Sequence, residues 1–152
     1  FNMRAASLSR TDGEPAPPDE KQVWLRPSNA NPVGKDNPIR IEWLAEPPHF
    51  GFWNSGEKVA WTVTLAAGGT YQAVANYATP TKGTRFSLLV DGQPVSEKEL
   101  VESGDWAKFS SLELGRIELT PGTHIVEAVW TTPESFGAGN FRDVRLQKLA
   151  GP

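Results

Sequence analysis

Apolar residues recur at every second position in several separate runs, and this period most constrains how the chain can fold. The alternation covers 39–43, 59–65, 71–77 and 86–90. Successive side chains of a β-strand point to opposite faces, so a period of two is typical of strands with one face in a core. The chain is therefore predicted to be all-β. Further strands are expected over 117–119, 124–131 and 141–149.

Turn residues separate these runs. Asp91-Gly92 is a tight hairpin signal, and Pro121-Gly122 has the order that a type II turn favours. Only 96–103, with three glutamates, is a helical candidate, and a loop between strands explains it equally well. Strands so close in sequence, without helical crossovers, predict an antiparallel two-sheet sandwich.

The length of 152 residues suits one domain. Residues 1–21 are polar and rich in proline, so we expect a linker or disordered tail there, with an ordered strand over 3–8 as the alternative. The sandwich is then expected over 22–152. Because the chain begins at Phe1 rather than methionine, we interpret it as a processed or excised piece whose targeting signal lay outside it.

Composition argues against several functions. The net charge is −3 and no basic stripe is present, which disfavours a nucleic-acid partner. No apolar run reaches membrane-spanning length, and the absence of cysteine excludes thiolate chemistry. No catalytic motif is found, so we predict that the chain is not an enzyme. A glycosidase pair such as Glu42 and Glu127 stays open, because only separation in space defines such a pair.

Six tryptophans are many for this length. Four fall in alternating patterns and are expected in the core: Trp24, Trp43, Trp61 and Trp130. Trp53 and Trp106 instead follow turn-like residues, where each would either stack on a ligand or cap the end of the core.

Five motifs then resemble a known family in order and spacing. They lie at 51–63, 69–92, 104–109, 119–124 and 141–146. Together they cover about residues 38–149. This pattern resembles carbohydrate-binding modules of family six, and also the C-terminal β-sandwich domains appended to bacterial fucosidases and sulfatases. The resemblance implies a galactose-binding-like jelly roll that binds sugar at its end loops or on a concave sheet face.

The resemblance also implies site residues at the sandwich end. Trp106 stands where one stacking aromatic is expected, and Phe52 or Trp53 would supply the other. Hydrogen bonds to the sugar are expected from Asn54, Asn140 and Arg142. The loops of 49–54 and 131–140 add His49 and Phe136. Arg142 could instead hold a carboxylate or sulfate of an acidic glycan.

A structural calcium is common in the modules that the chain resembles. The resemblance implies Asp143 as one ligand, with Glu42 or Glu46 as the other. The physical requirement is a cluster of oxygen ligands brought together from distant segments.

The leading hypothesis is a monomeric, non-catalytic carbohydrate-binding module. It would target a bacterial secreted enzyme, carried in the same chain, to a polysaccharide. The second hypothesis is a structural module that packs against a neighbouring domain and binds no ligand. The third is a small enzyme on the same scaffold, since fold does not decide function.

Overall fold

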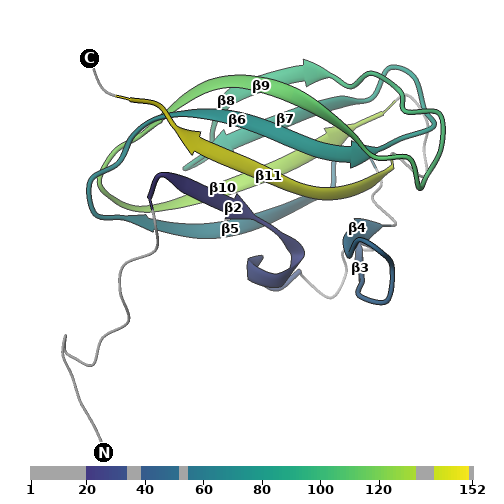
Figure 1. The fold of residues 1–152 in the computed structure, drawn as a ribbon, viewed down its shortest axis with the longest axis horizontal. Helices are drawn as coiled ribbons and strands as arrows, with labels where there is room; N and C mark the ends of the chain where they lie inside the picture. Colours follow the sequence, from purple (N-terminus) through teal and green to yellow (C-terminus); the bar gives the residue numbers. More distant parts are fainter. Residues whose placement is uncertain (1–19, 34–38, 52–54, 133–138, 151–152) are drawn as a thin grey trace, which may run out of the picture.

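The computed structural model describes residues 20–33, 39–51, 55–132 and 139–150 and shows two antiparallel sheets packed face to face (Figure 1). The all-β jelly-roll prediction is therefore confirmed. The four-stranded sheet has the order β5 (Lys58–Leu65), β10 (Gly122–Thr131), β7 (Arg85–Val90) and β8 (Gln93–Glu99). The described part of the chain contains no helix long and apolar enough to cross a membrane.

The second sheet has six strands and carries the features discussed below. Its order is β3 (Arg40–Glu42), β4 (His49–Gly51), β11 (Asn140–Lys148), β6 (Gly69–Ala78) and β9 (Ser110–Leu119). Strand β2 (Gln22–Leu25) pairs with β11 on the same edge as β4, and a 3-10 helix, η1 (Pro27–Asn29), follows it. Figure 1 shows η1 beneath the sandwich and the short β3–β4 hairpin beside it, toward the right end.

The inward faces of both sheets form one aromatic core. Phe141 of β11 lies at its centre, with ring centroids of Phe50, Phe86 and Trp130 within 5.4–5.9 Å and that of Trp61 at 6.3 Å. Alternation produces this core directly, because in β5 the buried positions are every second residue. The predicted burial of Trp61 and Trp130 is confirmed at 1% and 0% exposure.

A β-bulge interrupts β11 at its start. Phe141 is opposite Tyr77, but Asp143 is opposite Asn76, so Arg142 is one extra residue. A bulge changes the face on which the following side chains emerge. Phe141 points into the core, while Arg142 and Asp143 both lie toward the outer face of the sheet. Alternation then resumes with Val144 and Leu146 buried.

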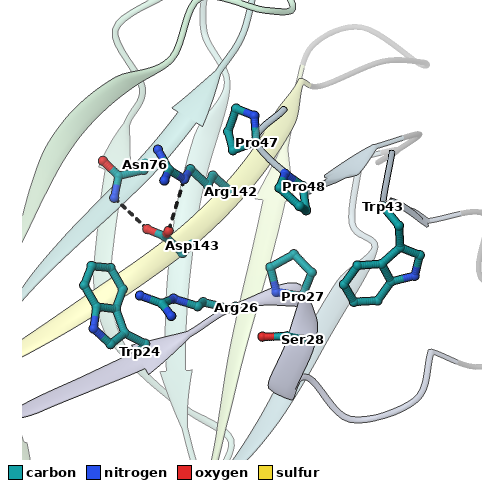
Figure 2. A pocket seen from close by; sticks show the side chains of 10 residues that line it. All are labelled: Trp24, Arg26, Pro27, Ser28, Trp43, Pro47, Pro48, Asn76, Arg142 and Asp143. Atoms are coloured by element: carbon teal, nitrogen blue, oxygen red, sulfur yellow. Dashed lines mark hydrogen bonds and ion pairs between the residues drawn. The ribbon is translucent and has the colours of Figure 1, made fainter. Parts of the chain in front are cut away.

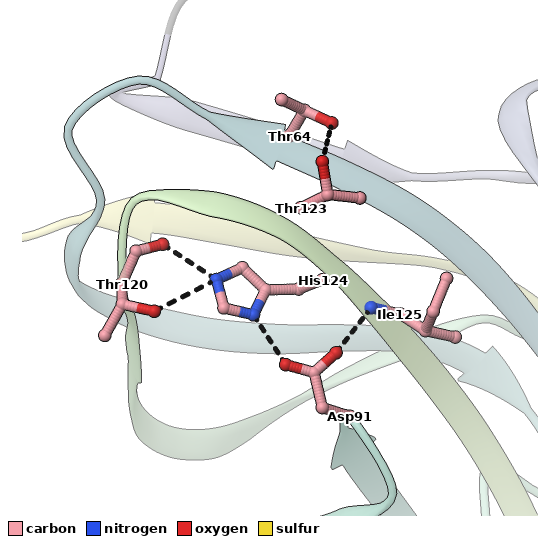
Figure 3. Close-up of polar contacts among 6 residues, drawn as sticks. All are labelled: Thr64, Asp91, Thr120, Thr123, His124 and Ile125. Atoms are coloured by element: carbon pink, nitrogen blue, oxygen red, sulfur yellow. Dashed lines mark hydrogen bonds and ion pairs between the residues drawn. The ribbon is translucent and has the colours of Figure 1, made fainter.

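Polar contacts join the turns at the other end of the sandwich (Figure 3). The carboxylate of Asp91, in the β7–β8 turn, accepts from the Ile125 backbone N–H at 2.8 Å and contacts His124 Nδ1 at 2.7 Å. His124 Nε2 lies 2.7 Å from the backbone oxygen of Thr120. Both ring nitrogens therefore face oxygen acceptors, and the hydrogen bonds to Asp91 and to Thr120 raise the pKa of His124.

Two segments differ from the sequence-based expectations. Residues 96–99 belong to edge strand β8, not to a helix or loop, and the strand's glutamates face solvent beside Arg85. Residues 49–51 were expected in a loop but form β4, whose three residues are all buried. At the N-terminal side, Glu20 accepts hydrogen bonds from the backbone N–H groups of residues 66–68, so the expected linker ends in contact with the sandwich.

Candidate functional site

A trough of about 310 Å³ lies on the outer face of the six-stranded sheet (Figure 2). Four separate parts of the chain form it: β2 with η1, the turn between β3 and β4, β6, and the bulge of β11. The lining residues are Trp24, Arg26, Pro27, Ser28, Trp43, Pro47, Pro48, Asn76, Arg142 and Asp143.

Indole rings stand at the two ends of this trough. Trp24 lies at one end and Trp43 at the other, with Pro27 and Arg142 between them (Figure 2). The prediction that both tryptophans are core residues is wrong. Trp43 is 56% exposed because β3 ends at Glu42 and the chain turns there, with the Ala45 N–H bonded to the Glu42 carbonyl. Trp24 is half-buried on the outer side of β2, opposite Arg145 of β11.

Two guanidinium groups give the trough its positive charge. The Arg26 guanidinium carbon lies 4.1 Å from the centroid of the Trp24 ring, a cation–π distance. Arg142 projects from the bulge, and its Nε lies 3.5 Å from the carboxylate of Asp143. Arginine offers several N–H donors in one plane, so both side chains suit oxygen-rich ligands.

A chain of hydrogen bonds holds the floor of the trough. Ser111 Oγ donates to Asn76 Oδ1 at 2.6 Å, and Asn76 Nδ2 donates to Asp143 Oδ1 at 2.6 Å. Asp143 is only 4% exposed and also faces Arg142 through its second oxygen. A buried polar group is stable only when its hydrogen bonds are made, so this chain fixes the orientation of Asn76 and of Asp143.

This arrangement suits a sugar better than it suits a reaction. Indole rings offer flat apolar surfaces for the C–H faces of a pyranose, and the guanidinium groups donate to hydroxyl or acidic oxygens. Asp143 is the one carboxylate among the lining residues that the structure describes, and it already contacts Asn76 and Arg142. The suggested glycosidase pair is not assembled either, because Glu127 pairs with Lys58 on the four-stranded sheet, while Glu42 belongs to the other sheet.

The residues expected at the sandwich end are only partly described. Phe52, Trp53, Asn54 and Phe136 lie outside the described residues. Trp106 is 44% exposed, and Asn140 Nδ2 donates to its backbone oxygen at 2.8 Å.

The remaining expected residues are described. The structure thus brings Asn140 to the Trp106 segment but places Arg142 in the trough. His49 is not among the residues that line this trough; it is 7% exposed, and its ring packs against Phe109 at a centroid distance of 5.6 Å.

Two of the expected calcium ligands, Glu42 and Asp143, contact other side chains. No group of three histidine, cysteine, aspartate or glutamate side chains capable of holding a metal is found in the described ranges. Both carboxylate oxygens of Asp143 already face Asn76 and Arg142, whose N–H groups occupy the space that a cation would need. Glu42 faces His49 instead, 3.4 Å away. Glu42 and Asp143 thus each have other partners in the structure, and calcium binding stays a prediction.

Sequence reasoning missed Trp24 and Trp43 as ligand platforms, and it also missed Arg26 and Asn76. Trp24 and Arg26 lie upstream of the region in which the family resemblance was seen. The sequence does carry one signal for the bulge. In the last strand Phe141 and Val144 are three positions apart, whereas a regular strand would place them two apart, as Val144 and Leu146 are.

Comparison with known proteins gives consistent results. Residues 50–145 match the family described as carbohydrate binding module (family 35). No match was found among curated protein sequences. Many solved structures share the fold, and isolated modules are among them. The C-terminal family-6 module of a marine laminarinase from Zobellia galactanivorans has a TM-score of 0.68 at 15% identity, over 84% of this chain and 99% of that one.

A family-35 module from Clostridium thermocellum has a TM-score of 0.61 at 17% identity, over 84% of this chain and 98% of that one. The β-(1,4)-mannanase of Podospora anserina, a GH26-CBM35 protein, has a TM-score of 0.67 at 16% identity, covering 88% of this chain and 29% of that one. At these identities the structural matches show the shared fold, and the family match covers well over half of the chain.

Proposed function

We propose that this chain, which belongs to family 35 of the carbohydrate-binding modules, binds an oligosaccharide segment of a polysaccharide in the trough between Trp24 and Trp43. It is a non-catalytic binding module. The observation that carries the choice of site is the pair of indole rings at the two ends of one hollow, with guanidinium donors between them. The affinity is expected to be micromolar to millimolar, about −8 to −4 kcal/mol, because a sugar offers little apolar area.

The ligand would enter a site that is largely formed beforehand. The hydrogen bonds from Ser111 through Asn76 to Asp143 fix the floor, and the prolines of η1 and of the β3–β4 connection restrict the walls. Binding then orders few side chains, which lowers its entropic cost.

We further propose that the module acts outside the cell and directs a catalytic domain of the same polypeptide to its substrate. The joining of family-35 modules to hydrolases, as in the GH26-CBM35 mannanase, supports this proposal. The residues before Glu20 provide a stretch rich in proline and polar side chains, which is typical of linkers between domains.

A second site at the sandwich end has one specific observation in its favour. Trp106 is 44% exposed, and Asn140 fixes its backbone, so an aromatic platform is held in place there as well. Trp106 does not line the trough, so the two sites can be tested separately.

The test is a glycan-array screen of the protein, followed by titration of the best polysaccharide into wild type, Trp43→Ala and Trp106→Ala. Trp43 and Trp106 are exposed to similar degrees and serve as each other's control. Loss of binding in Trp43→Ala alone supports the trough, and loss in Trp106→Ala alone moves the site to the sandwich end. A folded protein that binds no glycan would instead support the structural-module hypothesis.

A further inference from the structure

A second polar cluster lies outside the trough, on the hairpin of β3 and β4. Glu42 and His49 are directly opposite each other in this hairpin, so their side chains emerge on the same face. Glu42 Oε2 lies 3.4 Å from His49 Nε2. The His49 side chain is only 9% exposed, whereas that of Glu42 is 40% exposed. The imidazole is thus enclosed, and it faces a carboxylate that water can reach.

The orientation of the His49 ring is set by its other nitrogen. Nδ1 lies 2.8 Å from the backbone oxygen of Pro47, an acceptor, so Nδ1 carries a proton and donates it. Phe109 packs on the ring with a centroid distance of 5.6 Å. In the neutral ring, Nε2 then presents a lone pair, and this buried atom has no hydrogen-bond partner. Histidines that bind metals are held in this way, with one nitrogen donating to a backbone carbonyl and the other free.

A side-chain oxygen of Asn140, in β11, lies near Gly51 on the same hairpin. Gly51 is adjacent to the cluster, and a side chain there would overlap Glu42 Oε2 and would place its first carbon 3.3 Å from Asn140 Oδ1. The missing side chain of Gly51 therefore makes room for Glu42 Oε2, with Asn140 Oδ1 beside it. The amide nitrogen of Asn140 is already committed to the Trp106 carbonyl, which turns Oδ1 away from that contact.

We propose that Glu42 Oε2, His49 Nε2 and Asn140 Oδ1 bind one zinc ion, with water completing the coordination. Two ligands that are each about 2.1 Å from a tetrahedral zinc ion lie about 3.4 Å apart, which is the separation of the Glu42 and His49 atoms. An imidazole nitrogen with two oxygen ligands selects zinc or a similar transition metal over calcium, which prefers oxygen ligands alone. This site uses none of the residues that line the trough.

The second histidine of the chain provides a matched control. His124 also faces a carboxylate, that of Asp91, but at 2.7 Å, and its other nitrogen lies 2.7 Å from the Thr120 oxygen (Figure 3). Both nitrogens are in use, so His124 has no lone pair to offer. His124→Gln should leave zinc binding unchanged.

The test is calorimetric titration of zinc chloride into the untagged 152-residue protein after treatment with EDTA. Wild type and His124→Gln are expected to bind one zinc per chain, and His49→Gln and Glu42→Gln to bind it at least about tenfold more weakly. Circular dichroism checks the fold of each variant. If His49→Gln does not fold, Glu42→Gln still replaces the charged carboxylate by a weaker, neutral amide ligand at a half-exposed position.

Three outcomes would overturn the proposal. These are no zinc binding by folded wild type, unchanged binding in Glu42→Gln, or loss of binding in His124→Gln alone. Glycan titration of Trp43→Ala reports on the trough and not on zinc, so each proposal can fail without the other.

Discussion

The guanidinium of Arg26 packs on the indole of Trp24, with 4.1 Å between the guanidinium carbon and the ring centroid. One residue separates them in the chain, and that residue, Leu25, is buried in the core. Burial of Leu25 therefore fixes the backbone between the two residues, and both of their side chains line the trough. This contact places a positive charge beside a stacking surface, and the first prediction follows from it.

Arg26→Ala should weaken glycan binding about tenfold, or about 1.4 kcal/mol, and should weaken binding of uronic or sulfated glycans more than that of neutral ones. The physical reason is the loss of N–H donors and of charge beside Trp24. Titration calorimetry with a neutral and an acidic oligosaccharide measures both effects. Arg85→Ala, which removes an exposed arginine of the four-stranded sheet, is the control. Equal binding by Arg26→Ala and wild type would remove Arg26 from the site.

Asp143→Ala should destabilise the fold by about 1–3 kcal/mol, because Asn76 and Arg142 lose their partner while Asn76 stays half-buried. Chemical denaturation measures this cost. Glycan affinity should fall as well, since the floor of the trough loses its fixed geometry. Ser111→Ala is the milder comparison, because it removes only the hydrogen bond to Asn76 from the exposed side. An Asp143→Ala protein as stable as wild type would contradict the role assigned to the hydrogen bonds that run from Ser111 through Asn76 to Asp143.

The contact between His124 and Asp91 should make stability depend on pH. The hydrogen bond to Asp91 is the main cause that raises the pKa of His124, and the hydrogen bond from His124 is the main cause that lowers the pKa of Asp91. A raised histidine pKa adds stability that is fully present below its unfolded value, about 6.5, and is lost as pH rises through the folded pKa. A lowered aspartate pKa adds stability that is lost as pH falls below its ordinary value.

The free energy of unfolding of wild type minus that of His124→Gln should therefore be larger at pH 5.5 than at pH 8.5. Urea denaturation at the two pH values gives this difference. A difference that grows toward high pH would show that the imidazolium is not the stabilising form.

Phe141→Ala should cost about 3–5 kcal/mol, since its ring contacts four other aromatic rings at the centre of the core. Thermal or urea unfolding monitored by circular dichroism checks this value. Trp43→Ala, by contrast, should change stability by no more than about 0.5 kcal/mol, because the indole is 56% exposed. Comparable losses in both variants would mean that Trp43 packs on the core after all.

The architecture could be predicted because alternation reports burial directly. Trp61 and Trp130 have regular strand positions on both sides, and both are buried. The same rule failed for Trp43, because a period of two continues in sequence even where the chain has already left the strand. It also failed for β8, an edge strand whose exposed glutamates resemble a helix surface more than a sheet.

The trough was harder to predict, for a physical reason. It forms where β2, β6 and the β11 bulge meet, and Arg26, Asn76 and Arg142 are far apart in the chain. Only the register of the sheet brings them together, and a bulge of one residue decides which face Asp143 occupies. Resemblance to a family supplied the fold and the class of ligand, but not this local register.

The alternation between Leu25 and its neighbours, and between Phe141 and Arg142, has a consequence for how such a module can evolve. Residues that hold the sandwich together and residues that meet the ligand are adjacent in sequence but lie on opposite sides of one sheet. Selection can therefore exchange Trp24, Arg26 or Arg142 without repacking the interior. A few substitutions on one surface would suffice to move the preference from one polysaccharide to another while the domain continues to fold.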